Sequence, residues 1–578
     1  MKYGNIELTG SLDVSGSFIV PSGTSLPDET STPDGSLFYD TTNNILCGLI
    51  SGSWNTMPTV AGSNPYVRPI EYLVIAGGGG GGGTIAGGGG AGGLLSSSLA
   101  SVESGSSITI TVGSGGDGGY GWGTYTAATA GGDSSIAGTG ITTITAVGGG
   151  RGGDHYGSST TNNLPGDGGS GGGGGRSTSY PQAGGSSTAG QGNDGGSIAN
   201  GTIASNYGSG GGGAGAGGTI AGADADGGIG KQSSITGTST YYAGGGGGGI
   251  RSSAGSDVGE GGTGGGGNGS TAQSGQSGTV NTGGGGGGGG YTASSGNKTG
   301  GDGGSGIVVL AYDSGSINAI GGQERDAGNG KKAHKFGSSG TFFIGASTDF
   351  QIVTDDLLVN YDFANAATWD GSASTITDLQ GNHNLSVVSS PTLDLTHGGG
   401  LSLDGIDDHA VKTGISYTPY MVEIWLTSDI AINTSQYTDG NYASPLGIGD
   451  YPGGFTFGAY SGGMTNETIA FWGANYTSTG ATYIRDTFSA GTYQMVANWN
   501  GSTYDIWVNG SKKTSYAINT YGNTTLHVRD TIYLGKEDHP SQSYEFGGKI
   551  HNVKIYSAQK SDADVTQNWN ALRKRFGL

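Results

Sequence analysis

Long runs of glycine are the feature that most limits how this chain can fold. The first follows a short apolar stretch in EYLVIAGGGGGGGTIAGGGGAGGLL (residues 71–95), and glycine supplies 131 of the 578 residues, against a usual share of about 7%. Because such runs bury no side chains, their order must come from the backbone. A phosphate-binding loop, a flexible linker and a backbone lattice are the alternatives. The longest runs are 77–83, 171–175, 244–249 and 283–290.

The residues that follow these runs argue against a phosphate loop. A dinucleotide fingerprint needs a helix that begins in the glycines, and no helical periodicity follows the first run. No run is followed by the lysine of a Walker-type loop. Disorder is the stronger rival, because low hydrophobicity usually leaves no core. However, charged residues make up only 12% of the chain, and strand-like stretches at Tyr72–Ala76 and Ile307–Tyr312 bracket the block.

Polyglycine II packing explains the runs best. In this extended helix of three residues per turn, the N–H and C=O groups point outward in three directions. Neighbouring helices can then pair one another's backbone groups, as buried backbone requires, and only glycine lets the axes approach so closely. We expect residues 69–313 to form a glycine-rich domain of such helices with flanking strands, with disorder as the alternative.

Charge and apolar pattern argue against several partners. A net charge of −21 is unsuited to nucleic acid, which needs clustered Lys and Arg. The single cysteine, Cys47, allows no intrachain disulfide and no cysteine-based metal cluster. The first residues lack an apolar segment of the signal-peptide type, and no apolar run reaches membrane-spanning length. We therefore expect synthesis in a cytoplasm, without export by the usual route and without membrane insertion.

The segments beside the glycine block are predicted to be rich in β-strand. Residues 1–68 place apolar side chains at even positions and contain a strand pair around Leu37–Tyr39 and Ile45–Leu46. They indicate an attachment or oligomerisation module, or a leader of no special role. One chain could not bury that apolar face alone, so strands shared between chains are expected. Residues 314–352 are interpreted as a β-rich connector.

Residues 353–578 have the composition of an ordinary core, with six of the eight tryptophans. Alternating stretches meet at Asn500-Gly501 and at Asn509-Gly510, and such turns are a strong signal for an antiparallel meander. Many short strands over this length predict a β-sandwich or jelly roll. The predicted fold class is therefore mainly β throughout.

The chain is predicted to close with a short helix. Ser561 should cap it, and Asp564 should complete a capping box. The basic residues Arg573, Lys574 and Arg575 suit the negative end of the helix dipole. We interpret them as a solvated helix end.

Two resemblances add to this interpretation. EYLVIAGGGGGGG, SITITVGSGG, ITAVGGGRGG and the closing GGSGIVVLAYD resemble the glycine-rich domain of tail-fibre and tip-adhesin proteins of tailed phages, and GNIELTGSLDVSGSFIVPSG resembles phage fibre modules. LLVNYDF, ITDLQGNHNL, LSLDGIDDHAV, VEIWL, YDIWVNG and FGGKIHNVKIYSAQKSDADV resemble the concanavalin A-like, laminin G-like jelly rolls. The second resemblance implies carbohydrate or glycoprotein binding, often with calcium.

Calcium is the one cofactor that the resemblance implies. In such relatives an aspartate that opens a D-x-x-G-N-x-N loop often supports the ion, and Asp378, Asn382 and Asn384 hold the matching positions. Oxygen ligands of these types suit a hard cation. Relatives frequently carry an acidic residue where this chain has His551, so a structural turn without metal is the alternative. The acidic residues Asp404, Asp407 and Asp408 are explained by a solvated turn.

Catalysis is not expected. Glycoside hydrolysis needs two carboxylates about 5 to 10 Å apart. The glucanase members of this superfamily carry an E-x-D-x-x-E strand, whereas VEIWLTSD offers Glu423 with Trp425 at the position of the first aspartate. The histidines show no paired metal spacing, and no nucleophile elbow occurs.

Glycan binding would use aromatic faces and amide side chains on loops. Two loops offer them: NTSQYTDGNYASPLGIGDYPGG, and GDGGYGWGTYT, which should lie at an end of the glycine lattice. Tyrosines in the first loop would otherwise cap the core, and aromatics in the second would otherwise pack as a lid. The candidate residues are Tyr437, Asp439, Asn441, Tyr442 and Tyr451 in the first loop, and Tyr120, Trp122 and Tyr125 in the second.

Together these features predict a phage tail-fibre or tip protein that binds a host surface polysaccharide or glycoprotein by multivalent contacts. The resemblance implies a homotrimer in the virion, in contact with other tail or baseplate proteins. A purely structural fibre or decoration protein is the first alternative, and a polysaccharide depolymerase is the second.

Overall fold

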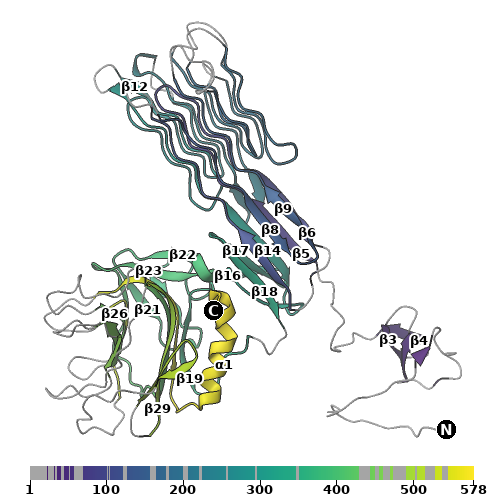
Figure 1. The fold of residues 1–578 in the computed structure, drawn as a ribbon, viewed down its shortest axis with the longest axis vertical. Coiled ribbons are helices and arrows are strands. Elements are labelled where there is room, and N and C mark those ends of the chain that lie inside the picture. Colours follow the sequence, from purple (N-terminus) through teal and green to yellow (C-terminus); the bar gives the residue numbers. More distant parts are fainter. Residues whose placement is uncertain are drawn as a thin grey trace. The chain divides into compact units, whose positions relative to one another are not determined.

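A computed structural model gives the fold of the protein (Figure 1). The chain separates into two compact units, Met1–Tyr66 and Val67–Leu578, and each is described by itself. None of the helices in the described part of the chain is long and apolar enough to span a membrane. The residues described are 22–23, 32, 36–40, 45–50, 53–56, 69–99, 102, 105–120, 126–155, 164–176, 181–198, 206–220, 224–254, 258–292, 296–345, 350–428, 443–448, 455–459, 469–472, 490–501, 504–513, 528–536 and 545–578.

The first unit contains a four-stranded sheet in the order β1-β2-β3-β4. The predicted strand pair is confirmed, because Leu37 pairs with Gly48 and Asp40 with Ile45 in antiparallel register. The apolar stretch expected before it, residues 6–20, lies outside the described residues. The strands are β1 (Ser22–Gly23), β2 (Leu37–Asp40), β3 (Ile45–Ile50) and β4 (Ser53–Thr56).

The second unit begins with two five-stranded sheets, which we call the base sandwich. Their orders are β16-β17-β14-β5-β6 and β15-β18-β7-β8-β9. Val74, Ile108, Leu310 and Phe342 are fully buried in one cluster between them. The strands are β5 (Ile70–Ile75), β6 (Leu94–Leu99), β7 (Ser107–Thr111), β8 (Ser134–Gly138), β9 (Ile141–Ala146), β14 (Ile307–Asp313), β15 (Asn318–Ile320), β16 (Gln323–Gly328), β17 (Lys331–Phe336) and β18 (Gly340–Gly345).

The two strand-like stretches that bracket the glycine block are neighbours in this sandwich. β5 and β14 pair antiparallel, from Ile75 with Ile307 to Glu71 with Ala311. Residues 314–352 are β-rich, as expected, but their strands do not form a separate connector. β17 pairs with β14 and β18 pairs with β7, because their apolar side chains complete the core of the same two sheets.

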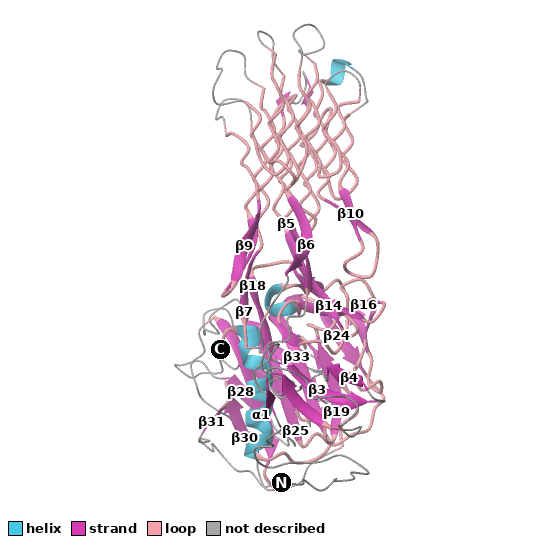
Figure 2. Ribbon diagram, turned by 90° about the vertical axis from the view of Figure 1, so that its right-hand side faces the viewer, coloured by secondary structure: helices cyan, strands magenta, loops and turns pink. Residues whose placement is uncertain are grey.

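The glycine-rich segments that connect the strands of the base sandwich leave its end and run back and forth as extended rods (Figure 2). The rods form neither regular strands nor helices, yet residues 76 to 93 are all buried. Short hairpins and one 3₁₀ turn interrupt the rods. These are β10 (Lys231–Ser233) with β11 (Thr240–Tyr242), β12 (Tyr291–Thr292) with β13 (Gly296–Asn297), and η1 (Ser252–Ala254).

The hydrogen bonds of the first rod repeat every three residues. Successive N–H groups donate to three different neighbouring rods in turn, and successive carbonyls accept from three other rods in the same way. This threefold order is the geometry of polyglycine II, so the expected lattice is confirmed and disorder is excluded for these residues. The N–H donors and carbonyl acceptors, 2.9 to 3.0 Å apart, are Gly77 to Gly132, Gly78 to Gly304, Gly79 to Gly90, Gly80 to Thr129, Gly81 to Gly301 and Gly82 to Gly87.

The spacing between rods leaves no room for side chains. A Cβ atom on Gly80 would lie 2.0 Å from the carbonyl oxygen of Asp117, and one on Gly88 would lie 2.0 Å from that of Gly246. Both distances are far below a van der Waals contact, and the obstructing atoms belong to the backbone of another rod. Glycine is therefore required inside the lattice by steric exclusion.

We predict that Gly80→Ala destabilises the lattice by about 3 kcal/mol, the upper end of the usual cost of overpacking, because the obstructing atoms belong to the backbone of another rod. Gly340→Ala is the matched control, since its Cβ would meet only ring carbons of Phe336 at 3.7 Å. Scanning calorimetry of the full chain measures both. Equal unfolding transitions in the two variants would contradict the packing described above.

The C-terminal part forms a second sandwich of an eight-stranded and a seven-stranded sheet. The first runs β22-β23-β33-β25-β29-β30-β31 with β19 beside β33, and the second runs β20-β21-β24-β32-β26-β27-β28. The strands are β19 (Leu357–Asp362), β20 (Thr375–Ile376), β21 (Leu385–Val388), β22 (Thr392–Asp394), β23 (Gly400–Asp404), β24 (His409–Lys412), β25 (Met421–Ser428), β26 (Ala443–Ile448), β27 (Phe455–Ala459), β28 (Ile469–Trp472), β29 (Gly491–Trp499), β30 (Tyr504–Val508), β31 (Ser511–Lys513), β32 (Ile532–Leu534) and β33 (Gly547–Tyr556).

Alternation along β25 separates the core of this sandwich from its outer face. Val422, Ile424 and Leu426 are buried with side chains of both sheets. Met421 and Trp425 belong to other buried clusters, together with residues of the C-terminal helix. The outer face of the eight-stranded sheet is therefore covered by the helix, as Figure 1 shows for α1.

The closing helix α1 (Asp562–Leu572) has the predicted capping box, formed by Ser561 and Asp564. A 3₁₀ turn, η3 (Arg573–Phe576), follows it, and another, η2 (Thr396–Gly398), precedes β23. The expectation of a solvated basic end is wrong for Arg575. Its guanidinium is buried and pairs with Asp362 at 2.7 Å, because Phe576 packs into the core and carries the turn inward.

Candidate functional site

Most of the predicted glycan-binding residues lie outside the described residues. These are Tyr437, Asp439, Asn441, Tyr442 and Tyr451, together with Trp122 and Tyr125. Tyr120 is described: its backbone forms an isolated bridge with Thr126 at the far end of the rods, and the residue is 41% exposed. The structure thus brings one of these aromatic side chains to a solvent-exposed end of the lattice, as its loop predicts.

The predicted calcium loop is held by backbone hydrogen bonds. Asp378 is buried, and its two carboxylate oxygens accept from four N–H groups. A carboxylate has about four acceptor positions, so none is left for a cation. Asn384 Oδ1 accepts from Asp378 N at 3.0 Å, and Asn382 contributes its backbone N–H. The N–H donors, 2.9 to 3.3 Å away, belong to Asn360, Gln380, Asn382 and His383.

His551, at the position where relatives carry an acidic ligand, does not complete a cation site. It is fully buried, with Nδ1 2.9 Å from Gly399 O and Nε2 2.8 Å from Thr427 Oγ1. Burial, and after it the charge of Arg575, lower the pKa of His551 to about 3. The residues present therefore do not fit the calcium that the resemblance implies, and the loop acts as a turn.

The acidic residues Asp404 and Asp408, which lie beside Asp407, also cap backbone N–H groups. Their carboxylate oxygens lie within 4.8 Å of one another. However, Asp408 accepts from Ser390 N and Asp404 N, and Asp404 accepts from Ile406 N. The cluster is a hydrogen-bonded turn, as interpreted from the sequence, but only Asp404 and Asp407 are solvated, because Asp408 is buried.

Glu423, the carboxylate of the incomplete glucanase motif, is enclosed beneath α1. It is fully buried, and Lys554 Nζ lies 3.5 Å from its Oε1. Trp425, at the position of the missing aspartate, stacks between Trp569 and Phe576. Glu423 anchors the helix and is closed to substrate. Its other partners are Trp425 Nε1 (2.7 Å), Gln494 Nε2 (2.9 Å) and Asn568 Nδ2 (2.7 Å).

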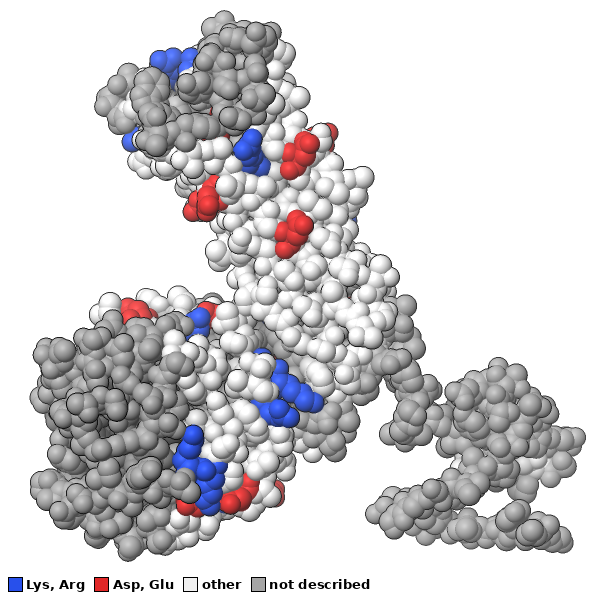
Figure 3. Space-filling view, in the orientation of Figure 1, with Lys and Arg blue, Asp and Glu red and all other residues white. Residues whose placement is uncertain are grey.

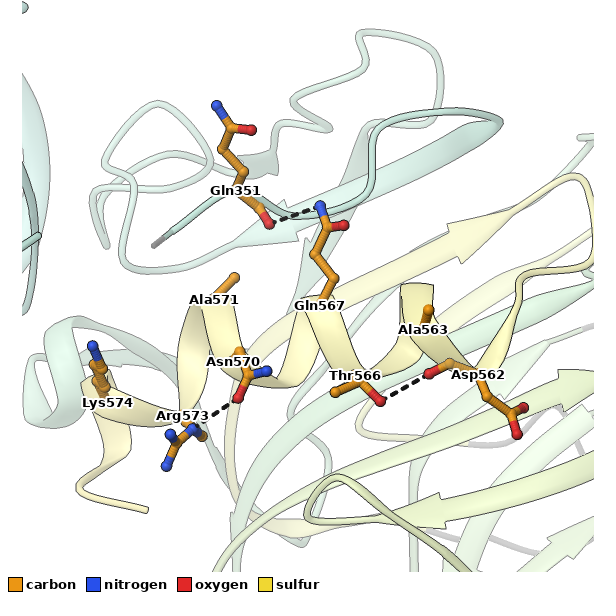
Figure 4. Close-up of a pocket in the computed structure, with 9 residues that line it drawn as sticks. All are labelled: Gln351, Asp562, Ala563, Thr566, Gln567, Asn570, Ala571, Arg573 and Lys574. Atoms are coloured by element: carbon orange, nitrogen blue, oxygen red, sulfur yellow. Dashed lines mark hydrogen bonds between the residues drawn. The ribbon is translucent and has the colours of Figure 1, made fainter. Parts of the chain in front are cut away.

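The solvent-facing side of α1 borders an open groove of about 940 Å³. Figure 4 shows its polar side chains, several of which bond to neighbours within the groove. Gln567 Nε2 donates to Gln351 O at 3.1 Å, and Arg573 Nε donates to Asn570 Oδ1 at 3.1 Å. These side chains form hydrogen bonds along the helix and do not converge on one point.

All four long glycine runs point in one direction, so the residues that follow them meet at the same end of the rods. We call this end the rod tip; it includes the turn Gly83–Ala86 and residues Tyr120, His155, Arg176, Ile250, Arg251 and Tyr291. The contacts that align the run ends are Gly289 N to Gly82 O (2.9 Å), Gly249 N to Ala86 O (2.9 Å) and Arg176 N to Ile85 O (3.0 Å).

Two arginines, a histidine and a tyrosine gather at the rod tip. Arg176 Nη1 lies 2.6 Å from His155 Nε2. Arg251 forms a parallel bridge with Tyr291, and its guanidinium carbon lies 5.1 Å from the centre of the tyrosine ring. Since a guanidinium only donates, His155 Nε2 is the acceptor and its imidazole is neutral.

The electrostatics of the rod tip agree with this arrangement. Burial, followed by the charges of Arg176 and Arg251, lowers the pKa of His155 to about 4. Burial and then Arg251 also lower the pKa of Arg176. Figure 3 shows Lys and Arg at this end of the rods and Asp and Glu farther along them. Among the described residues, the rod tip thus holds two arginines on a chain of net charge −21.

These residues could have been found from the sequence. The run 171–175 ends at Arg176, 283–290 ends at Tyr291, and 244–249 is followed by Ile250 and Arg251. What the sequence did not provide was the common direction of the runs, which turns three separate run ends into one cluster.

Comparison with known families finds two separate domains. Residues 56–313 match the family of glycine-rich domains, and residues 409–566 match the concanavalin A-like lectin/glucanases superfamily. The chain has a glycine-rich domain and a concanavalin A-like domain. The second is called the lectin-like domain below. No curated protein matches the sequence.

Solved structures resemble the chain only weakly. A Trypanosoma rangeli sialidase is 13% identical, with 39% of this chain and 34% of the sialidase covered and a TM-score of 0.29. Domain 4 of a Geobacillus stearothermophilus arabinanase is 15% identical over 37% of this chain and 98% of its own, at 0.28. The binding domain of botulinum neurotoxin DC is 13% identical over 38% and 52%, at 0.29. This chain thus spans about a third of the sialidase, and such TM-scores carry no inference.

We predict that the lectin-like domain needs no calcium for stability, whereas Asp378→Asn destabilises it by about 2 to 4 kcal/mol, because two or more buried N–H groups lose their acceptor. Tryptophan fluorescence during chemical unfolding of the full chain measures this, since six of its eight tryptophans lie within residues 353–578. Asp407→Asn, at an exposed position, is the control. A lower unfolding midpoint in EDTA, restored by calcium, would contradict the conclusion that the Asp378 loop is a turn without calcium.

Proposed function

We propose that the protein is a tail-fibre or tip protein of a tailed-phage virion, and that it binds a glycan on the host surface without cleaving it. The observation that supports this most is the combination, in one chain, of a lattice of glycine rods with a lectin-like domain. The interior of the lattice is held by pairing between backbone groups, so it places few constraints on the sequence of the loops at its tip. Such a scaffold suits the display of variable contact residues.

The lectin-like domain supports glycan as the class of receptor. The superfamily that it matches is named for lectins and glucanases. The enclosure of Glu423 beneath α1 favours binding over hydrolysis, because a catalytic carboxylate has to reach the glycosidic bond. We predict that the loops that carry Tyr437 to Tyr451 supply the sugar contacts of this domain.

The proposal includes assembly as a homotrimer. Residues 1–68 would join the chains or attach them to other tail or baseplate proteins in the virion. Three copies would multiply weak single-site affinities, because each further contact becomes intramolecular. No cofactor is proposed.

The test is binding of the full chain to an array of bacterial surface polysaccharides. We expect saturable binding to at least one polysaccharide, competed by the same polysaccharide in solution, without release of reducing ends. Analytical ultracentrifugation should give a species of three chains. Failure to bind any glycan or any bacterial cell would leave a purely structural fibre as the explanation. Release of reducing ends would instead identify a depolymerase.

A further inference from the structure

The arginines of the rod tip lack a carboxylate partner within the described part of the chain. Neither Arg176 nor Arg251 forms an ion pair with a described residue. The carboxylate of Asp154 lies in the same region, but it accepts from Gly83 N at 2.5 Å. The Nε atom of Arg176 is buried without a hydrogen-bond partner. Donors and positive charge thus accumulate here without an ion-pair partner among the described residues.

The two neighbouring arginines and the unpartnered Nε atom of Arg176 have an energetic cost that a ligand would remove. Burial, and after it the like charge of Arg251, lower the pKa of Arg176, and its buried Nε donor has no hydrogen-bond partner, which is unfavourable. Such features persist where they serve binding, since an anion between the two guanidinium groups would neutralise the repulsion and accept from Nε. Guanidinium groups match carboxylate and phosphate oxygens in pairs.

We propose that the rod tip is a binding site for the acidic group, phosphate or carboxylate, of a surface sugar. Arg176 and Arg251 contact the anionic oxygens. His155 accepts from Arg176 and holds that guanidinium in place, so it is a positioning residue. Tyr291 fixes Arg251 by a cation–π contact and offers ring edge to the sugar. No covalent step is involved.

A single acidic group on a sugar fits this site better than an extended polyanion. The net charge of the chain is −21, and a polyanion such as nucleic acid would meet the acidic sides of the rods beyond the tip. A monosaccharide with one acidic group contacts only the tip. The inference rests on the proposed function because it names a sugar class for the same chain, but it concerns a second site, separate from the lectin-like domain.

The test is calorimetric titration of the full chain, at low ionic strength, with glucose 6-phosphate, glucuronate and glucose. We expect binding of one or both acidic sugars and none of glucose. Glucose 6-phosphate and glucuronate distinguish phosphate from carboxylate as the group recognised. Arg176→Gln and Arg251→Gln should each weaken binding about tenfold or more, because a charge-assisted hydrogen bond is lost. Arg573→Gln, the same change in the turn η3 after α1, should leave binding unchanged.

Unfolding temperatures separate a binding role from a structural one. Arg251→Gln should unfold at the wild-type temperature without ligand and should lose the stabilisation that the acidic sugar gives the wild type. Arg251→Lys keeps the charge and should recover part of the affinity. The inference is overturned if the wild type binds neither acidic sugar, if glucose binds as tightly, or if the Arg176→Gln/Arg251→Gln double variant binds like the wild type. In each case, glycan binding through the lectin-like domain would leave the proposed function standing.

Discussion

Backbone pairing between glycine rods is the interaction on which the rest of this structure depends. A buried N–H or C=O group without a partner is costly, and the rods meet that requirement by sharing their groups among neighbours in a threefold order. The same geometry excludes side chains, since a Cβ on Gly80 would overlap the carbonyl of Asp117. Ordering glycine is entropically expensive, so the rods can form only together, anchored on the base sandwich.

This constraint also places the chemistry of the domain. Side chains are excluded from the interior of the lattice, so residues that can contact a ligand occur on its outer faces and where the rods turn. The four long runs rise in the same direction, which brings Arg176, Arg251 and Tyr291 to one end although they are far apart in sequence. The lectin-like domain is stabilised differently, because its apolar side chains form an ordinary core. A buried polar network around Glu423 holds α1 against one sheet.

The sequence predicted elements whose cause is local. The glycine runs, the capping box of Ser561 and Asp564, and the hairpin around Leu37 and Ile45 were all predicted because neighbouring residues determine them. It could not predict which rod lies beside which, since the runs are chemically identical. The Asp378 loop was located correctly, but its use as a cap depends on where four backbone N–H groups point. Arg575 was misjudged because the packing of Phe576, not the helix dipole, sets its position.

Amide hydrogen exchange of the full chain, followed by mass spectrometry, tests the central claim most directly. Fragments that cover residues 77–93 and 283–290 contain almost no side chains that could protect them, so any protection must come from hydrogen bonds between rods. The account predicts exchange as slow as that of β5 and β14 in the base sandwich. Exchange at the rate of an unstructured glycine peptide would contradict it, because the rods would then be a disordered chain.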